Sequence, residues 1–163
     1  SLLNKTNLNT NFINNIGSTW ANKIATTTWK VGGNTFKNIA KSVPSIAYQN
    51  EIVTPVKNTT YDAKIGLMYV SDYGFAASPS TWSTILTDYG NVNYNNWMYM
   101  GYVEWTISRI ADISDAAFPV YSSGIVYSGL VDRGNAVRPS FNLESSVTYV
   151  SGSGTQTDPI IIN

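Results

Sequence analysis

Residues 97–143 read WMYMGYVEWTISRIADISDAAFPVYSSGIVYSGLVDRGNAVRPSFNL, and they carry most of the information about the fold. Short runs of β-branched and aromatic residues alternate here with Gly and polar turns, as in VEWTIS, AFPVYSSGIVYSG and AVRPSFNL. This spacing is typical of a sheet built of short antiparallel strands. We expect strands of the same kind at WMYMG (97–101), SVTYV and DPIII.

The residues before this stretch predict helix and strand together. Apolar residues at steps of three and four predict an amphipathic helix over 8–26, namely Phe12, Ile13, Ile16, Trp20 and Ile24. The Gly-Gly pair in TTTWKVGGNTFKN (26–38) predicts a hairpin turn. Farther along, we expect loop with one strand over 38–60, a buried strand over 64–70, a short helix over 80–87 and a loop over 91–96.

Composition excludes several classes of function. The chain has 163 residues, which fits one domain, and it contains no Cys and no His. Disulfides, thiolate nucleophiles, imidazole bases and the usual His-containing metal sites are therefore excluded. Lys and Arg balance Asp and Glu at 10 each, which argues against nucleic acid as the main partner. Abundant Tyr, Ser and Asn with only 12% charged residues are typical of extracellular binding surfaces.

Signatures of catalysis are missing from the sequence. It contains no G-x-S-x-G elbow, no P-loop and no G-x-G-x-x-G preceding a helix. Asp112 and Asp115 lie close enough in sequence to act as a carboxylate pair, although two solvated acids are the simpler interpretation. A calcium site formed by Asp112, Asp115 and Asp132 is a further alternative, but their spacing does not match a calcium loop. We expect no enzyme activity and no cofactor.

The order W-x-x-S-R, G-x-V and V-R-P runs through the region, as Trp105, Ser108 and Arg109, then Gly124 and Val126, then 137–139. With Ala117-Phe118 and Ser140–Leu143, it resembles the C-terminal part of a C-type-lectin-fold domain. More narrowly, it resembles the variable proteins of diversity-generating retroelements and related bacterial surface domains. The resemblance implies one α+β domain over residues 1–163, with a motif-bearing core at 97–143. It also implies that Trp105 is core and that Arg138 pairs with a carboxylate or with backbone carbonyls.

The resemblance further implies a diversified window at residues 110–135. The mutagenesis of this family acts on template adenines, and at Asn codons it cannot produce Lys, Glu, Gln, Trp or Met. None of these five residue types occurs in 110–135, where their overall frequency would place about three. Asn itself is present there only as Asn135. Both features are what a scrambled Asn-rich template would leave.

Polar and apolar residues interleave in this window without the alternation of a half-buried strand, which favours a ligand-facing surface on a rigid scaffold. The predicted ligand-binding residues are Ile110, Asp112, Ile113, Ser114, Asp115, Pro119, Tyr121, Ser122, Ser123, Ile125, Tyr127, Ser128, Asp132 and Arg133. Two tyrosines, Tyr121 and Tyr127, are the expected anchors, and their replacement by Ala is expected to abolish recognition without unfolding the chain. The predicted core positions of the region are Phe118, Val120, Val126 and Val137.

We therefore expect reversible, non-catalytic recognition of a protein or glycan on another cell surface, by an extracellular or cell-surface protein. A polar hairpin without any partner is the plainer alternative. The sugar-binding motifs of animal C-type lectins (E-P-N, Q-P-D, W-N-D) are absent, so calcium-dependent sugar binding is not implied. A competing hypothesis is a pilin-like filament subunit, attached to a membrane or filament through an apolar segment upstream of Ser1.

Overall fold

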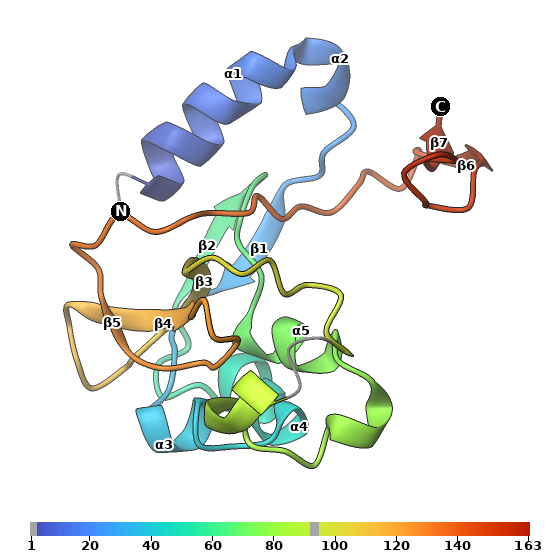
Figure 1. Ribbon diagram of the computed structural model, residues 1–163. Coiled ribbons are helices and arrows are strands. Elements are labelled where there is room, and N and C mark those ends of the chain that lie inside the picture. The colour runs from blue at the N-terminus through green and yellow to red at the C-terminus, as the bar shows by residue number, and fades with distance from the viewer. Residues whose placement is uncertain (1–2, 92–94) are drawn as a thin grey trace. The chain divides into compact units, whose positions relative to one another are not determined.

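The computed structural model describes residues 3–91 and 95–163 and shows an α+β fold (Figure 1). Two compact units make up the chain. The larger unit comprises Thr28–Asp62 and Gly66–Ser140, and the smaller comprises the described residues up to Thr27 with Ala63–Ile65 and Phe141–Asn163. The prediction of helices combined with short antiparallel strands is confirmed. The prediction of one domain over residues 1–163 stays a prediction.

The main sheet of the larger unit has the strand order β3-β4-β5 and is antiparallel. Its strands are β3 (Glu104–Arg109), β4 (Ala116–Val120) and β5 (Gly129–Leu130), drawn in yellow to orange in Figure 1. They coincide with the predicted strands in VEWTIS and AFPVYSSGIVYSG. The strand β4 lies in the centre, so β3 and β5 form the two edges of the sheet.

Short helices cover the rest of the larger unit. They are α3 (Phe36–Ile39), α4 (Pro44–Tyr48), η2 (Gln49–Val53), α5 (Val70–Phe75), η3 (Pro79–Thr81) and η4 (Leu86–Asn91). Local signals begin two of them, because Thr35 Oγ1 accepts the Asn38 amide and Pro44 occupies the first turn of α4. The prediction of loop over 38–60 is therefore wrong, and the helix predicted over 80–87 is two separate 3-10 turns.

One apolar core joins these helices to the sheet. Helical segments contribute fully buried Ile39, Val70, Tyr73, Leu86 and Tyr89. The strands and turns contribute Ile110, Phe118, Val120 and Val126. The burial of this cluster fixes β3 and β4 against the helices and makes them a rigid support for the turns at their ends.

The hairpin predicted at the Gly32-Gly33 pair is wrong. Instead, β1 (Thr27–Lys30) pairs with β2 (Thr60–Ala63) from farther along the chain. A Cβ on Gly32 would lie 1.4 Å from the carbonyl oxygen of Lys57, and Gly33 has φ +67 with the carbonyl oxygen of Arg109 2.3 Å from its Cβ position. The two glycines therefore permit a close approach of backbones and do not form a turn.

The apolar run at 64–70 is buried as predicted, but it is not a strand. Gly66 forms a single bridge with Ser140, and α5 begins at Val70. The Asp72 carboxylate accepts the Tyr69 amide at 2.8 Å, and the distant Glu51 accepts the Val70 amide at 3.1 Å. These contacts satisfy the first amide groups of the helix, so a residue far away in sequence decides where α5 begins.

Strand predictions at both ends of the motif-bearing region are also corrected. WMYMG (97–101) forms turns, and AVRPSFNL makes only single-residue bridges, such as Glu104 with Ala136. Of the loop predicted over 91–96, residues 92–94 lie outside the described residues.

The smaller unit contains a helical segment and a two-stranded sheet. The segment comprises η1 (Leu3–Phe12), α1 (Ile13–Ile16) and α2 (Ser18–Ala21), so it ends five residues earlier than predicted. Gly17, with φ +80, separates α1 from α2. Strands β6 (Tyr149–Ser151) and β7 (Ile161–Ile162) overlap the strands predicted at SVTYV and DPIII, and they pair with each other antiparallel. Among the described residues, no helix combines the length and the apolar character needed to cross a bilayer.

Candidate ligand-binding surface

The framework around the window is buried. Trp105 on β3 is 8% exposed and lies opposite Pro119 on β4. A Cβ on Gly129 would lie 3.3 Å from the Trp105 ring and 2.9 Å from Pro119, so only glycine fits beside them. The prediction that Trp105, Phe118, Val120 and Val126 are core is confirmed.

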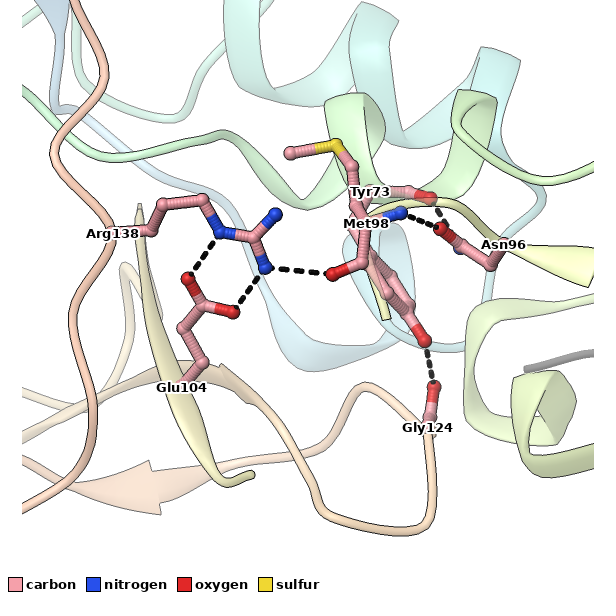
Figure 2. Close-up of polar contacts among 6 residues, drawn as sticks. All are labelled: Tyr73, Asn96, Met98, Glu104, Gly124 and Arg138. Atoms are coloured by element: carbon pink, nitrogen blue, oxygen red, sulfur yellow. Dashed lines mark hydrogen bonds and ion pairs between the residues drawn. The ribbon is translucent and has the colours of Figure 1, made fainter. Parts of the chain in front are cut away.

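Arg138 is bound to a carboxylate and to a backbone carbonyl, as predicted (Figure 2). Its Nε and Nη2 donate to the two carboxylate oxygens of Glu104, at 2.9 and 2.7 Å. Nη2 also donates to the Met98 carbonyl oxygen at 2.6 Å. Glu104 belongs to β3, so this bidentate pair joins the sheet to the 137–139 segment and to the segment after Asn96.

A chain of hydrogen bonds from α5 holds the turn that follows β4 (Figure 2). The buried Tyr73 hydroxyl donates to the Gly124 carbonyl oxygen at 2.8 Å. Asn96 donates to the Tyr73 carbonyl oxygen and accepts the Met98 amide, at 2.8 and 3.0 Å. Burial raises the pKa of Tyr73, so its hydroxyl stays a donor at neutral pH. Gly124 has φ +88, a conformation suited to glycine in a tight turn.

Four predicted residues form an exposed turn before β4, namely Asp112, Ile113, Ser114 and Asp115. The Val131 amide donates to the Asp115 carbonyl oxygen at 2.9 Å, and Ala116 pairs with Leu130. These contacts bring residues 130–133, which include predicted Asp132 and Arg133, beside the turn. We name residues 112–115 and 130–133 together the acidic edge.

Four more of the predicted ligand-binding residues lie at the opposite end of β4. Tyr121, Ser122, Ser123 and Ile125 belong to the turn after Val120, where the Gly124 amide donates to the Tyr121 carbonyl oxygen at 2.8 Å. Tyr99 donates to the Ser122 carbonyl oxygen at 2.6 Å. We name residues 121–125 the serine turn. Five strand residues separate it from the acidic edge, a span of roughly 15 Å.

Tyr127 and Ser128 lie between the two groups. The Tyr127 ring packs edge-on against Phe36, with 4.7 Å between ring centroids, and its side chain is 44% exposed. The Ser128 carbonyl oxygen accepts the Tyr121 hydroxyl at 2.8 Å. Both tyrosines therefore also take part in the local structure, and Tyr127 offers more of its surface to a ligand than the half-buried Tyr121 does.

Two predicted ligand-binding residues are corrected. Ile110 and Pro119 are fully buried, so their side chains cannot meet a ligand. Ile110 follows β3 and belongs to the core cluster, whereas Pro119 lies in the central strand opposite the buried Trp105. The opposite correction applies to Val137, which was predicted as core and is 38% exposed.

Sequence reasoning missed two exposed residues of the window, Leu130 and Val131, which are 46% and 56% exposed. With Ile113 at 43%, they place three aliphatic side chains in the acidic edge, next to Asp112, Asp115 and Asp132. Their position inside the window could have marked them as ligand-binding residues, but the sequence does not show whether an aliphatic residue there is exposed or belongs to the core. Within residues 3–91 and 95–163, no three acidic side chains gather closely enough to hold a metal ion, so the calcium alternative is not assembled.

A buried carboxylate supports the other side of β3. Glu51 is 2% exposed and accepts hydrogen bonds from Ser108 Oγ on β3 and from the Val70 and Ser71 amides at 3.1 and 3.0 Å. Burial raises the pKa of Glu51 to about 7, although the hydrogen bonds from Ser108, Ser71 and Val70 oppose this shift. The Glu51 carboxyl thus links η2, α5 and β3.

The geometry of the window and its framework is the basis for assigning a function, because similarity to known proteins identifies none. The chain matches no protein-family model, no curated protein and no solved structure.

Proposed function

We propose that the chain is a non-catalytic recognition protein that binds a macromolecular ligand through the exposed residues of the 110–135 window. One observation carries the proposal: within this window the residues expected to vary are mostly exposed, while those expected to be framework are buried. Of the 14 predicted ligand-binding residues, only Ile110 and Pro119 are buried. Phe118, Gly124 and Val126 of the same window are buried as well, as a scaffold requires.

The same pattern supports the relation to variable proteins of diversity-generating retroelements and, with it, a C-type-lectin-like fold and a place at a cell or phage surface. A diversified surface needs a framework that tolerates change at the turns. Here the Arg138 side chain binds that of Glu104 on β3, and the Tyr73 hydroxyl binds the Gly124 carbonyl oxygen within the serine turn. Neither contact involves a side chain that is expected to vary.

The spread of the exposed residues supports a protein or glycan ligand over a small molecule. The acidic edge and the serine turn lie roughly 15 Å apart, which exceeds the reach of most buried small ligands. The acidic edge combines aliphatic side chains with three aspartates and one arginine, so it favours a partner that offers both apolar and basic groups.

Sequencing the gene in sibling isolates tests the proposal at the level of residues. We expect substitutions to concentrate at 112–115, 121–123, 125, 127–128 and 130–133, with Trp105, Gly124 and Arg138 unchanged. Ile110 and Pro119 are the matched controls, because they lie in the same window but are buried. Even scatter along the chain, or a window that never changes, would contradict the proposal.

An array of purified glycans and bacterial surface proteins then tests binding itself. We expect the chain to bind one class of arrayed molecule, and Ile113→Ser with Val131→Ser to remove that signal without lowering Tm. Val53→Ser with Val56→Ser is the matched control, since both residues are similarly exposed and lie outside the window. Equal loss in both variants would show that the window is not the binding surface.

A further inference from the structure

The smaller unit contains an apolar groove with a volume of about 580 Å³. Phe12 and Ile16, four residues apart on one side of the helical segment, line one wall together with Trp20 of α2, which follows the break at Gly17. Phe141 and Leu143 contribute to the opposite wall, together with two isoleucines of the 160–162 segment. The apolar side chains that predicted an amphipathic helix thus line an open groove.

Backbone hydrogen bonds hold the walls of this groove together. Ile24 and Leu143 form an antiparallel bridge. The Ala25 amide donates to the Asn142 carbonyl oxygen at 2.9 Å, and the Glu144 amide donates to the Lys23 carbonyl oxygen at 2.8 Å. The residues after α2 and those at 142–144 are therefore fixed to each other, and the groove is a built feature of this unit.

The apolar side chains of the groove are widely exposed. Trp20 is 53% exposed, Ile160 51%, Phe141 44% and Leu143 43%. Contiguous apolar surface of this kind on a folded unit marks a binding site for an apolar molecule or surface. A ligand that covered it would bury most of its own apolar part, as in typical small-molecule sites of 300–1,000 Å³.

Two lysine side chains lie at the groove or next to it. Among the described residues, Lys23 is the only charged residue that lines the groove, and its ammonium group donates to the backbone oxygen of Asn163. The neighbouring Lys64 donates to the carbonyl oxygens of Ala21 and Ile24. The salt bridges among the described residues, Arg133 with Asp132 and Arg138 with Glu104, involve neither lysine.

We propose that this groove binds an amphiphilic anion, a molecule with an unbranched alkyl chain and a terminal carboxylate. The alkyl chain lies along the apolar walls, and the carboxylate meets the Lys23 ammonium group. A lysine suits this role because its stem packs along apolar surface while its charged end stays at the rim. The inference goes beyond recognition by the 110–135 window and does not rest on it.

Dodecanoate, kept below its critical micelle concentration, is the probe. Dodecyltrimethylammonium has an alkyl chain of the same length with the opposite charge, and acetate has the headgroup alone. Titration calorimetry on the whole chain measures each Kd, and quenching of Trp20, identified by its loss in Trp20→Phe, reports where the probe binds. We expect saturable one-to-one binding of dodecanoate, about tenfold tighter than dodecyltrimethylammonium, and no binding of acetate.

Three variants sharpen the test. Lys23→Gln removes the charge and should weaken dodecanoate binding about tenfold, with little effect on dodecyltrimethylammonium. Lys5→Gln is the matched control, because Lys5 is an exposed lysine of the same unit outside the groove, and its Kd should not change. Leu143→Asp places a negative charge on the wall and should abolish binding, with circular dichroism confirming the fold.

Several outcomes would overturn the proposal. Equal affinity for both alkyl probes, or no effect of Lys23→Gln, would mean that the groove binds alkyl chains without selecting the charge of the headgroup. Absence of saturable binding would mean that the groove is not a ligand site. A dimer by sedimentation that Leu143→Asp dissociates, with no dodecanoate binding, would assign the groove to a second copy of the chain. None of these results bears on the window, whose variants are tested separately.

Discussion

The guanidinium of Arg138 and the carboxylate of Glu104 form a two-point pair, with Nε to Oε1 at 2.9 Å and Nη2 to Oε2 at 2.7 Å. The Glu104 side chain is only 7% exposed, whereas that of Arg138 is 26% exposed. Glu104 therefore depends on Arg138 for compensation of its buried charge. Because Glu104 lies on β3, the pair fixes the strand next to the window.

Arg138→Met should lower the free energy of unfolding by about 3 kcal/mol, because it leaves a buried carboxylate without its partner. Urea denaturation followed by circular dichroism measures the change. Arg133→Met is the matched control: Arg133 lies 3.6 Å from Asp132, and both side chains are at least 70% exposed, so stability should hardly change. If adding Glu104→Met to Arg138→Met restores no stability, the uncompensated charge is not the cause of the loss.

The sequence predicted that Arg138 binds a carboxylate or backbone carbonyls and that Trp105 is buried, because the resemblance marks both as framework, but it did not identify Glu104 as the partner. It also predicted strands at β3, β4, β6 and β7, where β-branched residues and turn residues alternate, although AVRPSFNL forms no strand. It failed where a distant contact decides the local structure. The run at 64–70 has the composition of a strand, but Glu51 caps its last residues and α5 begins there. The Gly32-Gly33 pair has the composition of a turn, but it serves the packing of Lys57 and Arg109.

The sequence predicted where the candidate site lies, but not which of its residues are exposed and which are buried. The composition of 110–135 indicated the window, yet no pattern in it distinguished buried Ile110 from exposed Ile113. That difference arises because Ile110 donates its amide to the Ala116 carbonyl oxygen and turns its side chain into the core. The pairing of β4 with β5 then brings 130–133 beside 112–115, a non-local contact that spacing alone does not encode.

Glu51 should make stability depend on pH. Its pKa is about 7 in the folded chain, against an ordinary value of 4.5, so the folded state binds the proton more tightly than the unfolded state. The contribution of Glu51 to the free energy of unfolding is therefore fully present below about pH 4.5. It is lost as the pH rises from there through 7, which lowers the free energy of unfolding by at most about 3 kcal/mol. Glu51→Gln should remove most of this slope, as measured by urea denaturation at half-unit steps of pH.

Asp72→Asn is the companion variant for this experiment. Burial also raises the pKa of Asp72, which acts in the same direction, but Asp72 is more exposed than Glu51. We expect its replacement to change the slope less than Glu51→Gln does. An unchanged pH profile in Glu51→Gln would show that Glu51 is not the group that titrates.

Two glycines with positive φ should differ in their tolerance of alanine. Gly33 has φ +67, and a Cβ there would meet the Arg109 backbone oxygen at 2.3 Å. Gly17 has φ +80 but open space around its Cβ position. Gly33→Ala should cost about 3 kcal/mol and Gly17→Ala about 1 kcal/mol, because only the first adds a clash to the backbone strain. Thermal unfolding of both variants separates the two effects, and equal losses would contradict the packing assigned to Gly33.

Tyr121 and Tyr127 should affect folding and recognition to different degrees. The Tyr121 hydroxyl donates to the Ser128 carbonyl oxygen at 2.8 Å, so Tyr121→Phe should cost about 1 kcal/mol and loosen the serine turn. Tyr127→Ala removes an exposed ring that packs edge-on against Phe36, and we expect it to cost about 1 kcal/mol while lowering ligand binding more strongly. Urea denaturation and the array of surface molecules measure the two quantities.

The double variant Tyr121→Ala with Tyr127→Ala should remain folded, because neither residue belongs to the buried core of Phe118, Val120 and Val126. Phe36→Ala is its control, since it removes the ring partner of Tyr127 and leaves the exposed residues of the window in place. Phe36 also stacks on buried Phe118, so Tm is measured together with binding. If Phe36→Ala abolishes binding as fully as Tyr127→Ala does, the Tyr127 ring acts by holding the local structure. If the double variant unfolds, both tyrosines are structural, and recognition must rest on the acidic edge alone.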